Sequence, residues 1–176
     1  YGNEQAVAVY GCIGYITSIL YLLLQGVGDG SQPLISQYYG KGDHRCVRAT
    51  RKLAYLTAIV VTAVCMTGVY LARAKVGTLF GASQEANAGV IQYLPLFLAT
   101  LLCLAFVRIT TSYFYATEKN KLSYLLVYAE PICTLLMLLI LPPVLKLTGV
   151  WLAVPIAQVL TFVIAWVAKR RVDAKI

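Results

Sequence analysis

Two ionisable residues, Arg108 and Glu130, lie inside apolar stretches of the sequence, and their spacing relates them to each other. Each is eleven residues away from Lys119, which belongs to the polar segment 118–121 between those stretches. In an antiparallel helical hairpin, residues equidistant from the turn lie level with each other. At about 1.5 Å rise per residue, both would lie roughly 15 Å from the turn, near the middle of a bilayer. We therefore expect Arg108 and Glu130 to pair or to share a polar cavity.

A carboxylate at this depth can do chemistry. A charge at the bilayer centre costs about 3 kcal/mol on insertion scales, so such residues usually face the bundle interior and often mark ion pathways. Burial disfavours the charged form, so Glu130 can exchange a proton or hold a Na⁺ ion. Pro131 removes a backbone donor and frees a nearby carbonyl oxygen, as in the broken helices of transporters. The alternative is a structural ion pair, in which Arg108 and Glu130 only neutralise each other.

Asp29 is the third candidate, and its depth has two interpretations. If the span ends near Gly28, Asp29 is an interfacial acid. If the span continues past Pro33, Asp29 lies in the cytoplasmic half of a cavity beside Gln32. Other polar side chains within the spans complete the candidate lining, although each alone is more simply a packing or interfacial residue. These are Tyr21, Gln25, Thr111, Tyr115 and Gln158.

The elements that position these residues are long apolar stretches. The chain is 60% hydrophobic and 12% charged, whereas soluble domains contain roughly a quarter of charged residues. Five stretches match or exceed the ~20 residues that cross a bilayer as a helix. They are 5–39, 50–73, 89–116, 122–145 and 149–169. We therefore predict an all-α integral membrane protein, with the lipid bilayer as its main partner.

Small and polar residues recur along one face of the stretch 5–39, and two interpretations stay open for it. The face either packs on another helix, for which Gly26-x-x-x-Gly30 is suited, or lines a polar cavity. The glycines and Pro33 also predict a kink or hinge. The face comprises Tyr10, Gly14, Thr17, Tyr21, Gln25, Gly28 and Gln32. In the stretch 149–169, small residues at i+4 spacing predict a packing ridge. That ridge comprises Gly149, Ala153, Ala157, Thr161 and Ala165.

The net charge of +8 follows membrane sidedness, so we expect no nucleic-acid partner. With five spans, eleven Lys and Arg residues fall on one side and three on the other, which places the loops 40–49 and 117–121 and the C-terminus in the cytoplasm. The first group comprises Lys41, Arg45, Arg48, Arg51, Lys52, Lys119, Lys121, Lys169, Arg170, Arg171 and Lys175, and the second Arg73, Lys75 and Lys146. An odd number of spans with an external start, and no initiator Met, predict further helices upstream.

Metal and enzyme chemistry find little support in the sequence. The five cysteines form no Cys-x-x-Cys pair, and four lie within apolar stretches, as small buried hydrophobes do. His44 is the only histidine, so this chain builds no multi-histidine metal centre. No nucleophile–base pair occurs either. We expect a protein that is not an enzyme and needs no cofactor besides a coupling ion.

Three stretches carry a resemblance to a known family. They are Gly30-Ser31-Gln32-Pro33-Leu34-Ile35-Ser36 followed by Tyr39-Gly40-Lys41-Gly42-Asp43, then Ser112-Tyr113-Phe114-Tyr115-Ala116-Thr117, and Gly149-Val150-Trp151-Leu152-Ala153-Val154-Pro155. Their order and spacing resemble the C-terminal half of multidrug and toxic compound extrusion (MATE) transporters. The resemblance covers essentially the whole chain. It implies helices eight to twelve of a twelve-helix fold, hence five helices of one six-helix bundle, with an N-terminal half of the same polypeptide as partner.

The resemblance implies a function as well. MATE transporters export amphipathic, often cationic, organic compounds across the cell membrane in exchange for H⁺ or Na⁺. Their cation-binding acids lie largely on the seventh helix, which precedes this sequence, and on the helix that corresponds to 89–116. At the middle of that stretch this chain has Arg108 and no acid. This departure makes Glu130, one helix later, the expected substitute.

Two other functions remain open. A flippase for lipid-linked oligosaccharide precursors, from the same superfamily, shares the architecture but needs a more basic cavity for phosphates. One Arg facing two acids argues against it. A non-transporting membrane assembly subunit would bury Arg108 and Glu130 at a cost, unless a partner helix pairs with them.

Overall fold

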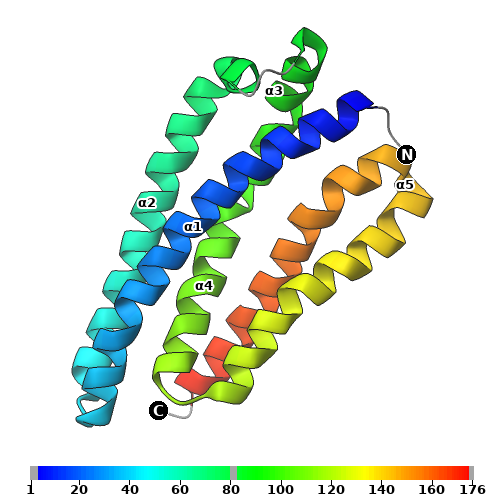
Figure 1. The fold of residues 1–176 in the computed structure, drawn as a ribbon. Coiled ribbons are helices and arrows are strands. Elements are labelled where there is room, and N and C mark those ends of the chain that lie inside the picture. Colours follow the sequence, from blue (N-terminus) through cyan, green and yellow to red (C-terminus); the bar gives the residue numbers. More distant parts are fainter. Residues whose placement is uncertain (1–3, 80–82, 175–176) are drawn as a thin grey trace.

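The computed structural model describes residues 4–79 and 83–174, and every regular element in this part of the chain is a helix (Figure 1). The elements are α1 (Glu4–Gly40), α2 (His44–Leu79), α3 (Gln84–Ala99), α4 (Leu101–Ala116) and α5 (Asn120–Asp173). Four segments are long and apolar enough to cross a membrane: Glu4–Gly40, His44–Lys75, Gln84–Ala116 and Asn120–Asp173. The predicted all-α membrane architecture is confirmed.

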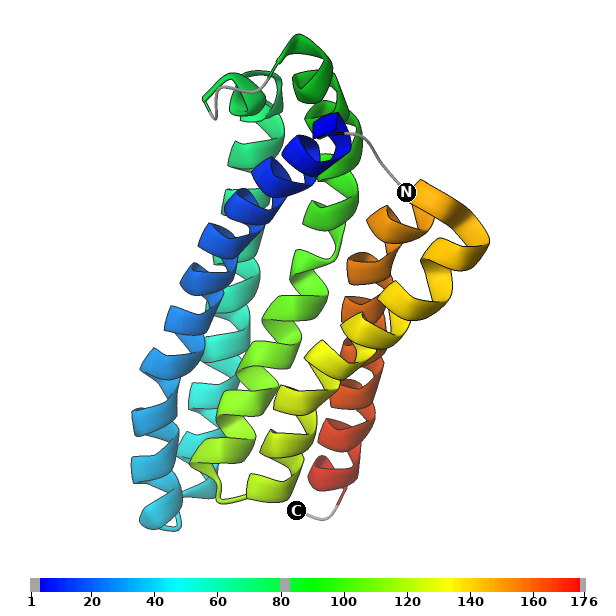
Figure 2. The same cartoon turned by 45° about the vertical axis from the view of Figure 1, so that its right-hand side comes forward.

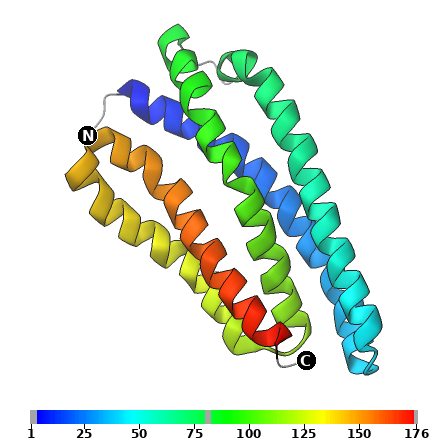
Figure 3. The same cartoon turned by 180° about the vertical axis from the view of Figure 1, so that it is seen from behind.

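The fourth segment, α5, is a hairpin of two arms. Its 54 residues would measure about 80 Å as a straight helix, far more than the ~30 Å of a hydrocarbon layer. The chain turns back at Lys146, whose backbone is not helical (φ 53°, ψ −130°). Figures 2 and 3 show both arms on one side of α4, with α1 and α2 on the other side. The two arms, α1, α2 and the α3–α4 segment therefore make five passes through the bundle.

The observed helices extend beyond several predicted ranges. The helix predicted at 50–73 begins at His44, because Asp43 caps it: the Cys46 amide donates to Asp43 Oδ1 over 3.0 Å. The same hydrogen bond holds the pKa of the Asp43 carboxyl below its usual value. The segment predicted at 89–116 begins at Gln84 and is divided at Thr100 into α3 and α4.

The first helix is unbroken through the segment in which the glycines and Pro33 predict a kink or hinge. Helix α1 continues from Glu4 to Gly40 with Pro33 inside it. Pro33 has no amide hydrogen, so the carbonyl of Asp29 loses its usual i+4 donor while the helix continues. A kink or hinge at this proline stays a prediction, and apolar side chains of α1 pack into the bundle on both sides of it.

Two apolar clusters hold the bundle together, one in each half of its length. The ridge of small residues on the second arm of α5 is buried: Ala153, Ala157 and Ala165 are 0% exposed. It therefore forms the packing surface that its spacing predicts.

Large apolar side chains cover the outside of the bundle, as expected for surfaces that face lipid. Examples are Leu22 and Ile19 on α1, Val64 and Leu71 on α2, and Leu139 on α5.

The end of the bundle that holds the 41–43 turn, the 117–119 turn and the C-terminal part of α5 is rich in basic residues (Figure 1). Arg51 of α2 pairs with Asp173 of α5 over 2.7 Å and lies 4.5 Å from the centre of the Tyr113 ring of α4. Lys119 lies over the Tyr113 ring as well, and burial, followed by the charge of Arg51, lowers its pKa. These contacts tie α5 to α2 and α4 at this end.

Gly149 lies where the second arm of α5 passes the end of the first. A Cβ at Gly149 would lie 2.4 Å from the backbone oxygen of Leu141. We expect Gly149→Ala to destabilise the protein by about 2 kcal/mol, because backbone cannot yield as a side chain does. Thermal unfolding of the purified full-length protein measures this. The matched control is Gly68→Ala, whose Cβ meets no described atom within 4 Å. Equal melting temperatures of the two variants would contradict the prediction.

Candidate functional site

Arg108 of α4 and Glu130 of the first arm of α5 are in contact in the middle of the bundle. One terminal nitrogen of Arg108, Nη2, donates to Glu130 Oε2 over 2.5 Å. The side chains are 18% and 24% exposed. The residues lie level with each other, as their equal distance from Lys119 predicts.

Tyr21 of α1 completes this contact. The guanidinium carbon of Arg108 lies 4.2 Å from the centre of the Tyr21 ring, within the range of cation–π attraction. Arg108 therefore links α4 to α1 as well as to α5. Its Nε atom is buried and finds no hydrogen-bond partner among the described residues.

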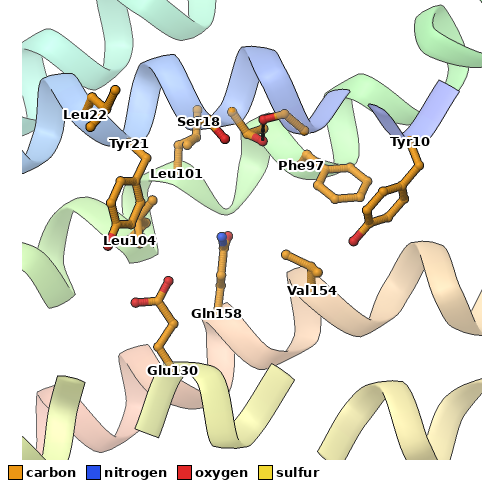
Figure 4. A pocket seen from close by; sticks show the side chains of 12 residues that line it. Tyr10, Ser18, Tyr21, Leu22, Phe97, Leu101, Leu104, Glu130, Val154 and Gln158 are labelled. Atoms are coloured by element: carbon orange, nitrogen blue, oxygen red, sulfur yellow. Dashed lines mark hydrogen bonds between the residues drawn. The ribbon is translucent and has the colours of Figure 1, made fainter. Parts of the chain in front are cut away.

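A cavity beside the pair has a volume of about 500 Å³ and lies between α1, the α3–α4 segment and both arms of α5 (Figure 4). The Glu130 carboxylate and the Gln158 amide reach into it from α5, opposite Tyr21 and Ser18 of α1. The Oε1 atom of Gln158 is buried and has no partner among the described residues. The lining comprises Tyr10, Gly14, Thr17, Ser18, Tyr21, Leu22, Phe97, Leu101, Leu104, Glu130, Val154 and Gln158. We refer to this space as the upper cavity.

A second cavity of about 490 Å³ adjoins the pair on its other side. Arg108, Glu130 and Tyr21 border it together with apolar residues of α5. Pro131 removes the amide that would bond to the carbonyl of Val127, which also borders this space. The lining comprises Tyr21, Arg108, Val127, Glu130, Pro131, Thr134, Leu135 and Leu138. Glu130 therefore borders this cavity as well as the upper cavity.

A third, smaller cavity of about 130 Å³ connects Arg108 to Asp29. It is lined by Gln25, Asp29, Gln32, Arg108, Thr111, Ser112, Tyr115, Ser123 and Val127. Asp29 therefore borders a cavity beside Gln32, although its side chain is exposed, and its depth in the membrane stays a prediction. We refer to this space as the lower cavity. All nine candidate residues from the sequence border one of the three cavities; their roles stay predictions.

The polar face of α1 lines these cavities. Gly14, Thr17 and Tyr21 border the upper cavity, and Gln25 and Gln32 the lower one. At Gly26 and Gly30, which the sequence suits to helix packing, no described atom lies within 4 Å of an added Cβ, so no described helix packs closely there. Gly28 makes the close approach instead, since its Cβ would lie 2.7 Å from the Ser112 hydroxyl oxygen.

An aromatic cluster at the far end of the upper cavity was not predicted. Trp151 stacks on Tyr93 with ring centres 4.3 Å apart and planes 1° apart. Tyr10 and Phe97, which line the upper cavity, contact the same indole at 5.6 and 6.4 Å. Aromatic residues are common at membrane interfaces, so their presence in the sequence did not indicate this cluster.

Comparison with known proteins agrees with the fold. The model of the MatE family matches residues 1–142. The multidrug export protein MepA of Staphylococcus haemolyticus (strain JCSC1435) is 26% identical over 158 residues, which are 90% of this chain and 34% of MepA.

Solved structures show the same fold. The outward-facing conformation of a multidrug resistance MATE family transporter of the MOP superfamily superimposes with a TM-score of 0.87 at 19% identity, covering 98% of this chain and 40% of that chain. The inward-facing conformation of such a transporter gives 0.82 at 15% identity, covering 92% and 37%.

The chain thus spans about a third of the curated relative that it matches. The family model nevertheless covers well over half of the 176 residues, and the bundle has the transporters' architecture. This chain therefore belongs to the MatE family of multi-pass membrane transporters, the multidrug and toxic compound extrusion proteins.

Proposed function

We propose that the full-length protein carrying this chain is a secondary antiporter, which exports amphipathic cationic organic compounds in exchange for H⁺ or Na⁺. One observation carries this proposal: the Glu130 carboxylate reaches into a cavity of about 500 Å³ at mid-bundle depth. The name of MepA, a multidrug export protein, supports it.

The upper cavity has the physical properties that such a ligand requires. Pockets for drug-sized molecules usually measure about 300–1,000 Å³ and combine an apolar wall with few polar groups. Here Tyr10, Tyr21 and Phe97 offer ring surfaces, and Glu130 is the only acid in the lining. Aromatic faces and a carboxylate both attract an organic cation, while apolar side chains accept its hydrophobic body.

Exchange follows if the substrate and the coupling ion share Glu130. A proton needs only the carboxylate. A Na⁺ ion needs further oxygen ligands, and the carbonyl that Pro131 frees at Val127 and the hydroxyl of Thr134 border the adjoining cavity. When either ion occupies Glu130, the attraction for the organic cation falls, so release of one accompanies binding of the other.

The sidedness of the bundle supports export from the cytoplasm. The basic turns and the C-terminal part of α5 lie at one end (Figure 1), and the excess of Lys and Arg there supports a cytoplasmic position for that end in a cell-membrane protein. This bundle would form one wall of the transport cleft, and the remaining polypeptide the other. The likeness to both outward- and inward-facing transporters is consistent with a bundle that keeps its fold during alternating access.

A flippase for lipid-linked precursors is not favoured. Recognition of phosphate needs several positive charges. Among the residues that line the three cavities, Arg108 is the single basic one, beside the acids Glu130 and Asp29. This balance favours a cationic ligand.

Efflux from vesicles tests the proposal. The full-length protein is reconstituted into liposomes, and release of the fluorescent cation ethidium is followed under an imposed proton gradient and, separately, a sodium gradient. We expect one gradient to drive release, and an ionophore that collapses it to stop release. Vesicles without protein measure the passive leak of ethidium, which is subtracted. Failure of both gradients to drive ethidium, with movement of a lipid-linked precursor instead, would overturn the proposal.

A further inference from the structure

Arg108 lies between two carboxylates, and only one of them is its partner. It contacts Glu130, which lines the upper cavity, and itself borders the lower cavity, which Asp29 also lines. We propose that Arg108 is a tethered cation, which leaves Glu130 and pairs with Asp29 when an organic cation or coupling ion binds at Glu130. This inference rests on the proposed function and adds an internal exchange step to it.

The contact between Arg108 and Glu130 is weaker than an arginine–carboxylate pair can be. A guanidinium has five N–H donors and often binds a carboxylate through two parallel hydrogen bonds. Here a single contact joins Arg108 Nη2 to Glu130 Oε2, and Arg108 Nε is buried without a partner in the described part of the chain. A partly buried ion pair with unmet donors recovers little of its desolvation cost. A bound cation that takes the place of the Arg108 guanidinium beside Glu130 therefore costs the protein little interaction free energy.

The lower cavity offers the second position. Asp29 forms no ion pair with any described residue, and Arg108 is the only basic side chain in this lining. Neutral acceptors surround it: the side-chain oxygens of Gln25, Gln32 and Thr111 border the same space. Pro33 and Pro131 also leave the carbonyls of Asp29 and Val127 without their helical donors. These oxygens can accept hydrogen bonds from the Arg108 N–H groups that form none with Glu130.

Tyr21 provides the pivot between the two positions. Its ring lies 4.2 Å from the Arg108 guanidinium carbon and borders both large cavities, while Asp29 stands two turns further along the same helix. An arginine that swings from Glu130 towards Asp29 keeps contact with this ring face. The exchange also removes a positive charge from the place where the substrate cation binds, so Arg108 does not repel it.

A double-mutant cycle on ethidium binding tests the exchange. Affinity is measured by fluorescence anisotropy on the purified full-length protein and its variants. Asp29→Asn removes the second position of Arg108, so we expect it to weaken ethidium binding about tenfold when Arg108 is present. In an Arg108→Gln background the same substitution should change affinity by less than about twofold, because no cation remains to be received.

The controls separate a moving charge from a fixed one. Arg108→Lys keeps a tethered cation and should restore the effect of Asp29→Asn. Glu118→Gln, which removes an exposed acid in the turn after α4, should leave ethidium affinity unchanged. Melting temperatures establish that each variant folds.

Three outcomes would overturn the inference. Equal weakening by Asp29→Asn in both backgrounds would make Asp29 a direct ligand of ethidium. No weakening in either background would leave Arg108 fixed on Glu130. If the unmodified protein neither binds nor exports ethidium, the proposed function fails and the inference fails with it. In the first two outcomes, export of ethidium by the unmodified protein leaves the proposed function standing and contradicts the exchange alone.

Discussion

Glu130→Gln is expected to lower the rate of ethidium efflux from vesicles at least about tenfold at subsaturating substrate. A carboxylate about 4 Å from a cation contributes roughly 4 kcal/mol at an effective dielectric constant of 20. A third of that energy already corresponds to a factor of about ten in affinity for the cation. Glutamine keeps the shape of Glu130 but removes the charge that faces the upper cavity, so no carboxylate in this lining attracts the cation.

The comparison needs a variant that changes charge without touching the cavities. Glu118→Gln provides it, because Glu118 lies exposed in the turn after α4 and borders none of the cavities described above. We expect wild-type efflux from this variant. Wild-type efflux from a folded Glu130→Gln protein would show instead that Glu130 serves only as the structural partner of Arg108.

Trp151→Ala is expected to destabilise the protein by about 3–5 kcal/mol, the usual cost of removing a buried tryptophan. Trp151 is 3% exposed and contacts Tyr10 of α1 together with Tyr93 and Phe97 of α3. It thus attaches the second arm of α5 to two other helices at the end of the upper cavity. Thermal or denaturant unfolding in detergent measures the loss.

Trp166→Ala is the matched control for this substitution. Trp166 lies on the same arm of α5 and also contacts aromatic rings, those of Phe106 and Phe162, but it is 43% exposed. Detergent or lipid can fill much of the space that its removal leaves, so we expect less than half of the loss seen for Trp151. A similar loss of unfolding free energy in both variants would mean that the deeper burial of Trp151 adds nothing to stability.

The juxtaposition of Arg108 and Glu130 followed from the sequence because a short polar turn fixes the register of a hairpin. Counting from Lys119 was therefore sufficient. The position of Asp29 did not follow, because it depends on how far α1 continues beyond Gly28 and on which helix lies opposite. No local pattern specifies either of these; the lower cavity is closed by α4 and α5 residues distant in sequence.

The division of α3 from α4 at Thr100 and the cluster around Trp151 were not predicted either. Thr100 lies within a continuous apolar stretch, and its hydroxyl donates to the carbonyl of Phe97, an ordinary contact within a helical turn. Trp151 and Tyr10 meet only because the second arm of α5 returns beside α1. Features that depend on such tertiary contacts leave no period or motif in the sequence.

The turn of α5 at Lys146 has a consequence for the biosynthesis of the protein. The basic residues at the two ends of α5, Lys119 and Lys121 at the start of the first arm and 169–171 near the end of the second, lie at the end of the bundle where the hairpin begins and ends. Within α5, Lys146 at the turn is the only basic residue at the opposite end. Moving one lysine through the bilayer centre costs about 3 kcal/mol, which two apolar arms readily offset. The two arms of α5 can therefore insert into the membrane together, as one helical hairpin, during synthesis.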